Sequence, residues 1–141
     1  MSLIAGPIAL RDESHSLALA RALAPHLRAG DTLLLSGQIG AGKSFFARAL
    51  IRARTGNPDE EVPSPTFTLV QSYEAPGAEI WHCDLYRLSG PFELVELGLE
   101  EALGRAICLI EWPDRIAPIL PKNTVHIHLT HLEQGGRQID V

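Results

Sequence analysis

Two short runs of the chain are continuously apolar, without the alternation of polar and apolar positions that marks a half-exposed strand. They are residues 32–36, with Leu33, Leu34 and Leu35 at the centre, and residues 106–110. Strands that are buried on both faces have this character and are typical of parallel sheets covered by helices. The pattern therefore predicts an α/β fold with a parallel sheet at its core.

Helical spacing precedes and follows the first of these runs. Apolar residues recur every three or four positions in residues 17–27, and Asp12 or Ser14 is the predicted N-cap. Pro25 predicts that this helix kinks or ends near that residue. A second helix is expected at residues 43–54.

The remaining elements are shorter. The second helix should bury Phe46, Ala49 and Leu50, and the proline-rich residues 62–66 should form an ordered loop. The other expected elements are strands at residues 8–10, 67–73, 79–83, 124–129 and 137–141, and helices at residues 92–97, 100–103 and the start of 113–120. No repeat or linker interrupts them, so residues 1–141 are expected to form a single domain.

Composition narrows the class of protein. The 141 residues are 45% hydrophobic and 21% charged, which suits one compact domain with its own core. The net charge is −5, whereas proteins that hold nucleic acid through their own field usually carry a basic excess. Direct, high-affinity binding of nucleic acid is therefore disfavoured.

The cysteines and the hydropathy of the chain indicate in which cellular compartment the protein works. Cys83 and Cys108 each lie in an apolar stretch, as buried and reduced thiols do. No apolar run approaches the roughly 20 residues that span a bilayer. The chain also lacks the basic start and long apolar segment of a signal peptide. We expect a cytoplasmic protein that does not engage a membrane.

The strongest chemical signal is a glycine-rich segment between the first apolar run and the second helix. Its residues are Gly37, Gln38, Ile39, Gly40, Ala41, Gly42, Lys43 and Ser44. The spacing and the strand–loop–helix setting are those of a P-loop, whose glycines bring backbone N–H groups to phosphate oxygens. Lys43 would reach the β- and γ-phosphates, and the Ser44 hydroxyl would ligate Mg²⁺. The segment predicts binding of ATP or ADP with Mg²⁺, and Phe45 completes the predicted nucleotide-binding stretch.

Metal-assisted phosphoryl transfer also needs a carboxylate beside the P-loop. Ligands of open α/β sheets bind beyond the carboxyl ends of the parallel strands. Asp84 follows residues 80–83 and Glu111 follows residues 106–110, so either acid could hold Mg²⁺ or orient the attacking water. Thr66 lies in the proline-bordered loop, where a P-loop hydrolase commonly carries a hydroxyl that senses the γ-phosphate. These three side chains also have structural interpretations: each acid could be a helix N-cap or a solvated strand end, and the threonine could be a structural loop residue.

Four more side chains have both a functional and a structural interpretation. Trp112 could stack on a ligand or a partner, or belong to the core or its rim. His126, His128 and His131 invite a metal site, but their strand alternates with apolar residues. The histidines more simply form the exposed face of that strand.

The motifs found so far fall in four ordered segments. They are residues 35–44, 64–70 (Ser-Pro-Thr-Phe-Thr-Leu-Val), 82–88 (His-Cys-Asp-Leu-Tyr-Arg-Leu) and 109–113 (Leu-Ile-Glu-Trp-Pro). Together these segments resemble the TsaE family, also called YjeE, which comprises small bacterial P-loop ATPases of the tRNA threonylcarbamoyladenosine pathway. The resemblance covers nearly the whole chain, and the second and third segments are far more specific than a P-loop alone.

The resemblance implies a three-layer P-loop fold whose central parallel sheet is flanked by antiparallel strands. It also implies weak ATP hydrolysis and partnership with TsaD and TsaB, which transfer the threonylcarbamoyl group to adenosine 37 of tRNA. The chain would then meet tRNA only through that complex. In this likeness Asp84 takes the Walker-B-like part, Glu111 approaches the metal or the water, and Thr66 belongs to a switch-like loop. Trp112 sits at the nucleotide or partner surface.

The chain departs from the family pattern at two positions. The family usually has aspartate where this chain has Gln38, which removes a charge beside the phosphates, and often threonine at Ser44, which keeps the hydroxyl. Two other functions would use the same loop. A small-molecule kinase would also need an acceptor pocket and a lid with arginines, and an adaptor would signal by shape with negligible hydrolysis. Arg87 is the candidate arginine finger.

Overall fold

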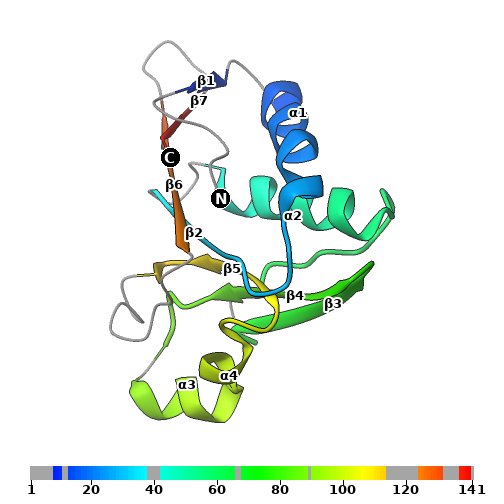
Figure 1. Cartoon of the computed structure of the whole chain (residues 1–141). Helices are drawn as coiled ribbons and strands as arrows, with labels where there is room; N and C mark the ends of the chain where they lie inside the picture. The colour runs from blue at the N-terminus through cyan, green and yellow to red at the C-terminus, as the bar shows by residue number, and fades with distance from the viewer. Residues whose placement is uncertain are drawn as a thin grey trace.

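The computed structural model describes residues 8–10, 13–37, 42–65, 68–88, 90–113, 124–131 and 137–140. The strands are β1 (Ile8–Leu10), β2 (Thr32–Ser36), β3 (Val70–Ala75), β4 (Ala78–Asp84), β5 (Ile107–Glu111), β6 (Thr124–His131) and β7 (Arg137–Asp140). The helices are α1 (Glu13–Leu23), α2 (Lys43–Thr55), α3 (Pro91–Leu97) and α4 (Leu99–Ala102), with a 3-10 turn η1 (Ala24–His26) after α1. Figure 1 shows α1 and α2 on one side of the strands and α3 and α4 on the other.

The strands form one seven-stranded sheet in the order β1-β7-β6-β2-β5-β4-β3. The four central strands β6, β2, β5 and β4 are parallel to their neighbours in this order. Antiparallel pairs flank them, with β7 and β1 beyond β6 and with β3 beyond β4. This arrangement confirms the predicted α/β fold with a parallel centre and antiparallel edges.

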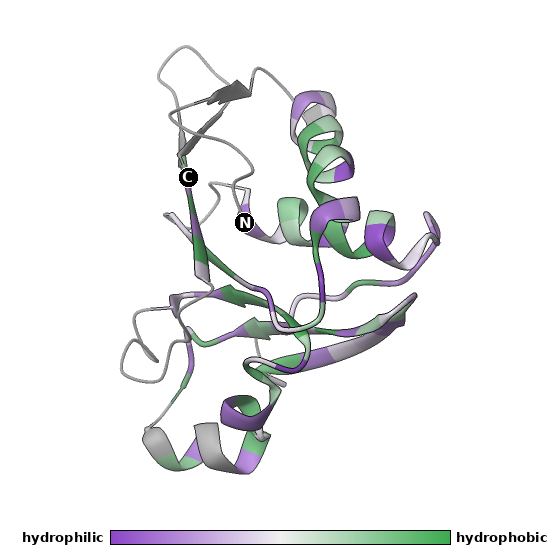
Figure 2. Ribbon diagram, viewed as in Figure 1, coloured by the Kyte–Doolittle hydropathy of each residue, from purple (hydrophilic) through white to green (hydrophobic). Residues whose placement is uncertain are grey.

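Strand β2 lies at the centre of the sheet and is covered on both faces. Successive side chains of a strand point to opposite faces. Leu33 and Leu35 belong to one buried cluster with Phe46 of α2, whereas Leu34 belongs to a second cluster with Leu99 of α4. Figure 2 shows hydrophobic colouring along the central strands and alternating polar and apolar segments along α1 and α2. Burial from both sides explains why this strand lacks alternation in the sequence.

Helix α2 matches the predicted helix closely. It starts after Gly42 and ends before Gly56, and both glycines adopt left-handed backbone conformations, with φ of 102° and 75°. The N–H of Gly56 donates a hydrogen bond to the carbonyl of Arg52 over 3.1 Å, as helix C-caps commonly do. The predicted core residues Phe46, Ala49 and Leu50 are all buried.

One predicted strand begins three residues later than expected, and one of the two predicted N-caps is excluded. The strand expected at residues 67–73 begins only at Val70, because Leu69 has φ of 69°, which a strand cannot accommodate. The Leu69 carbonyl instead accepts a hydrogen bond of 2.9 Å from the N–H of Asp84. Helix α1 starts at Glu13, which places Ser14 inside the helix and not at its N-cap.

The predicted end of α1 is confirmed. The helix ends at η1, which contains Pro25, as the proline predicted. Asp12, the alternative N-cap, lies outside the described residues. In the part of the chain that the structure describes, we find no helix long and apolar enough to cross a membrane.

Candidate functional site

The chain leaves β2 at Gly37 and enters α2 after Gly42. Both glycines have positive φ, 138° and 102°, as the predicted P-loop requires of its glycines. The N–H of Phe46 donates to the carbonyl of Gly42 over 2.9 Å and closes the first helical turn. The N–H groups of that turn carry the partial positive charge of a helix N-terminus. The predicted loop residues Gln38, Ile39, Gly40 and Ala41, and the predicted switch residue Thr66, lie outside the described residues.

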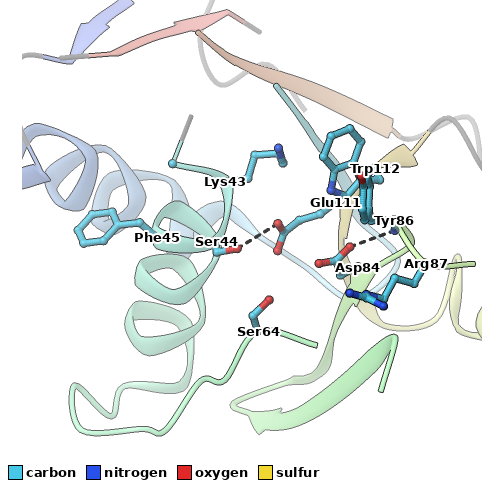
Figure 3. A pocket seen from close by; sticks show the side chains of 10 residues that line it. Lys43, Ser44, Phe45, Ser64, Asp84, Tyr86, Arg87, Glu111 and Trp112 are labelled. Carbon is cyan, nitrogen blue, oxygen red and sulfur yellow. Dashed lines mark hydrogen bonds between the residues drawn. The ribbon is translucent and has the colours of Figure 1, made fainter. Parts of the chain in front are cut away.

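A cavity of about 410 Å³ lies where the start of α2 meets the carboxyl ends of β4 and β5. Its lining residues are Gly42, Lys43, Ser44, Phe45, Ser64, Asp84, Tyr86, Arg87, Glu111 and Trp112. Figure 3 shows Ser44 facing the carboxylate of Glu111, with Asp84 beside it and Phe45 directed away from both acids. Every predicted site residue in the described part of the chain, apart from Gly37, lines this cavity.

The two acids come from the ends of neighbouring strands. Asp84 and Glu111 are the last residues of β4 and β5, are paired in register, and are only 6% and 2% exposed. Oε1 of Glu111 accepts a hydrogen bond of 3.2 Å from the Ser44 hydroxyl. Oδ1 of Asp84 accepts one of 3.1 Å from the backbone N–H of Tyr86. Adjacent buried carboxylates repel each other, and such arrangements are concentrated at functional sites.

A third buried polar side chain, that of His82, contacts Glu111 from outside the cavity. His82 precedes Asp84 by two residues on β4, so both side chains point to the same face of the sheet. His82 is 1% exposed, and its Nε2 lies 2.7 Å from Oε2 of Glu111. His82 was not among the predicted site residues. Its spacing of two from Asp84 is the signal that could have placed it beside the acids.

Lys43 is buried at the first position of α2. Its Nζ donates a hydrogen bond to the carbonyl of Gly37 and lies 4.3 Å from the centre of the Trp112 ring. Burial lowers the pKa of the Lys43 ammonium below its ordinary value, and the two strand-end carboxylates oppose that change only in part. A buried ammonium has lost part of its hydration. An anionic oxygen would therefore be a stronger acceptor for it than the neutral carbonyl of Gly37.

Aromatic side chains form one wall of the cavity. Trp112 packs on Tyr86 with ring centres 4.8 Å apart and planes inclined by 46°. Trp112 also has φ of 59°, a left-handed conformation that is uncommon for a bulky residue and is found preferentially at functional sites. Tyr86 and Ser64 also line the cavity, although neither was among the predicted site residues. Arg87, the candidate arginine finger, lines it as well.

The histidines of β6 lie elsewhere. His126 and His128 are exposed on one face of that strand, and both contact the Ser36 hydroxyl, at 2.7 and 2.8 Å. This agrees with the exposed face that their alternation predicted. Within the described ranges, no group of three or more His, Cys, Asp or Glu side chains is arranged to hold a metal ion.

The fold and the site together define a class. A parallel sheet whose central strand leads through glycines into a helix, with acids at the adjoining strand ends, is the architecture of P-loop nucleotide-binding proteins. Comparison with known proteins is more specific. The family model described as "Threonylcarbamoyl adenosine biosynthesis protein TsaE" matches residues 10–139, and the chain therefore belongs to the TsaE family.

Individual relatives agree with this assignment. The tRNA threonylcarbamoyladenosine biosynthesis protein TsaE of Rickettsia bellii is 38% identical over 141 residues, which cover 100% of this chain and 97% of the relative. The protein of the same name from Treponema pallidum is 38% identical over 116 residues, 82% of this chain and 84% of the relative. The crystal structure of Bacillus subtilis YdiB matches with a TM-score of 0.75 and 26% identity, over 94% of this chain and 81% of that one. The family resemblance predicted from four segments is confirmed.

Proposed function

We propose that this chain binds ATP with Mg²⁺ in the cavity at the start of α2 and hydrolyses the nucleotide slowly on its own. The approach of the Ser44 hydroxyl to the Glu111 carboxylate, at 3.2 Å, carries this proposal, because it brings the start of α2 and the end of β5 into one cavity. TsaE family membership supports the biological setting. In that setting, the nucleotide cycle assists TsaB and TsaD as they transfer the threonylcarbamoyl group to adenosine 37 of tRNA.

The oxygen atoms at the cavity fit a magnesium ion. Mg²⁺ prefers hard oxygen ligands and is usually held by one or two carboxylates together with substrate phosphates and waters. The Ser44 hydroxyl and the Glu111 carboxylate, already in contact, would hold the ion, and Asp84 would bind it or one of its waters. Bound there, Mg²⁺ would neutralise negative charge on the phosphates.

The other cavity residues would bind and orient the nucleotide. The Lys43 ammonium would leave the carbonyl of Gly37 for the phosphates, since the opposite charges of ammonium and phosphate add an attraction that a neutral carbonyl lacks. Glu111 would orient the attacking water, and Arg87 would stabilise charge on the transferred phosphoryl group. Hydrolysis should stay slow until a partner completes the site, because positioning and charge stabilisation of the transferred group supply most of the rate of phosphoryl transfer.

The proposal can be tested by calorimetry with ATP and ADP in millimolar Mg²⁺, followed by measurement of phosphate release with and without TsaB and TsaD. The parent should bind both nucleotides, release phosphate slowly and accelerate when the partners are added. Lys43→Ala should weaken ATP binding about 10- to 100-fold, since it removes a charged hydrogen-bond donor worth about 1.5–3 kcal/mol. Arg105→Ala is the matched control, because this exposed side chain lies on the approach to β5 and pairs with Glu79.

Each alternative has its own outcome. No heat with either nucleotide would refute nucleotide binding. ATP binding without phosphate release, even with both partners present, would identify a non-hydrolysing adaptor. Phosphoryl transfer that needs a small-molecule acceptor would identify a kinase. If Lys43→Ala bound ATP and supported tRNA modification as well as the parent, the assigned mechanism would be wrong.

A further inference from the structure

His82 is a buried histidine of β4 that contacts Glu111 of the candidate site without lining the cavity itself. It is 1% exposed, and its Nε2 lies 2.7 Å from Oε2 of Glu111. Withdrawing a histidine and a carboxylate from water is costly, and apolar side chains of similar volume often pack as well or better. The contact therefore calls for an explanation beyond packing.

The hydrogen-bond partners fix which nitrogen of His82 carries the hydrogen. A carboxylate oxygen only accepts, so Nε2 must be the donor to Glu111. Nδ1 is buried and has no hydrogen-bond partner in the described part of the chain. The ring is therefore held with its hydrogen on Nε2, directed at Glu111.

The two oxygens of Glu111 then have different partners. Oε2 accepts from His82 at 2.7 Å, and Oε1 accepts from the Ser44 hydroxyl at 3.2 Å. The first contact comes from the interior of the sheet and the second from the start of α2. With Oε2 anchored in the interior, the carboxylate is held with Oε1 facing the cavity.

We propose that His82 is a positioning residue, which holds the Glu111 carboxylate so that Oε1 faces Ser44 and the nucleotide-bound metal. This inference rests on the proposed function, because it assigns His82 to the Mg²⁺–nucleotide site. Removing a partner that orients a metal-binding side chain typically lowers metal affinity or activity about 10- to 100-fold. The same range is expected for His82.

Three substitutions separate positioning from packing. His82→Gln places an amide N–H near the position of Nε2 and keeps the donor. His82→Asn places its amide nearer the backbone, at the level of Nδ1, and does not reach Glu111. His82→Leu fills the volume without a donor. Thermal unfolding of each variant shows whether it is folded before binding is measured.

The measurement is ADP affinity by calorimetry, in Mg²⁺ and in EDTA. In EDTA, all three variants should bind ADP within about twofold of the parent, because His82 does not touch the phosphate-binding residues. In Mg²⁺, His82→Leu and His82→Asn should bind about 10- to 100-fold more weakly than the parent, and His82→Gln should recover most of the loss. In a Glu111→Gln background, His82→Leu should cause little further loss, because both changes act on one contact.

Several results would overturn the inference. A folded His82→Leu variant with the parent's affinity in Mg²⁺ would show that the histidine does not position the site. Equal weakening in EDTA and Mg²⁺ would assign His82 to the structure of the loop. If His82→Leu does not fold, equal affinities of the Gln and Asn variants in Mg²⁺ decide against positioning. A parent protein that binds no ADP at all would instead refute the proposed function.

Discussion

Replacing Glu111 by glutamine exchanges one carboxylate oxygen of the candidate site for an amide group and keeps the shape of the side chain. In the parent, this carboxylate accepts hydrogen bonds from Ser44 and His82. The glutamine carbonyl can still accept from His82, while its NH2 group donates to the Ser44 hydroxyl, which accepts as well as donates. The fold should therefore tolerate the change. The Ser44 lone pair, however, would accept from the amide and would no longer be available to the proposed metal ion.

The expected magnitudes separate stability from activity. Two charge-assisted hydrogen bonds become neutral, so the free energy of unfolding should fall by about 1 kcal/mol, less any relief of repulsion with Asp84. For a chain of this length that lowers Tm by about 2–5 °C. Turnover should fall at least about 100-fold, the lower end of what a group that takes up or orients a proton contributes. That factor corresponds to about 2.7 kcal/mol on the barrier.

The assay is single-turnover release of phosphate from ATP in the presence of TsaB and TsaD, with nucleotide affinity measured separately in EDTA. Glu101→Gln, an exposed glutamate of α4, is the matched control and should behave as the parent does. Glu111→Gln should keep its affinity in EDTA and lose turnover. Unchanged turnover would remove Glu111 from its proposed role. Lost affinity in EDTA would mean that Glu111 supports the phosphate-binding loop and not the metal.

Two further predictions concern the interior. Burial raises the pKa of the Cys108 thiol to about 12, so this thiol should react with DTNB at pH 8 roughly 1,000-fold more slowly than a free thiol. Burial also raises the pKa of Cys83 well above its ordinary value, and Cys83 should likewise react far more slowly than a free thiol. Both should react at once in denaturant, and rapid labelling of the folded protein would contradict the burial of the two thiols. Phe46→Ala removes a fully buried ring from the α2–sheet cluster and should lower the free energy of unfolding by about 3–5 kcal/mol, measured by urea unfolding. A loss below about 1 kcal/mol would show that the ring is not packed as described.

Local sequence signals predicted the strands at the centre of the sheet, but not their order. The apolar runs of β2 and β5 revealed burial on both faces, because burial acts on each residue separately. The insertion of β5 between β2 and β4, although β4 precedes it in the chain, depends on long-range packing and has no local signal. The start of β3 was missed for a different reason. The left-handed backbone of Leu69 follows from its surroundings, since a leucine carries no intrinsic preference for it.

In the candidate site too, some features could be predicted from the sequence, whereas others depend on the folded structure. The polarity of a parallel sheet brings strand-end acids to one edge, so Asp84 and Glu111 could be expected near the start of α2 from their positions alone. Which acid contacts Ser44 depends on distances that only the folded chain has, and the structure gives this contact to Glu111. His82 was missed because a polar residue inside an apolar strand looks like an interruption unless its position relative to Asp84 is considered.

The burial of charge at this edge of the sheet argues for a ligand more strongly than any single motif does. Asp84 and Glu111 are buried side by side, and burial of Lys43 lowers the pKa of its ammonium, so the fold disfavours the charged form of this side chain. In a core shaped by stability alone, apolar residues of similar volume would often serve equally well or better. A triphosphate with its magnesium ion would bring the opposite charges to both groups, the cation to the carboxylates and the phosphates to the ammonium. The arrangement that is unfavourable for folding is thus the one that binding would offset.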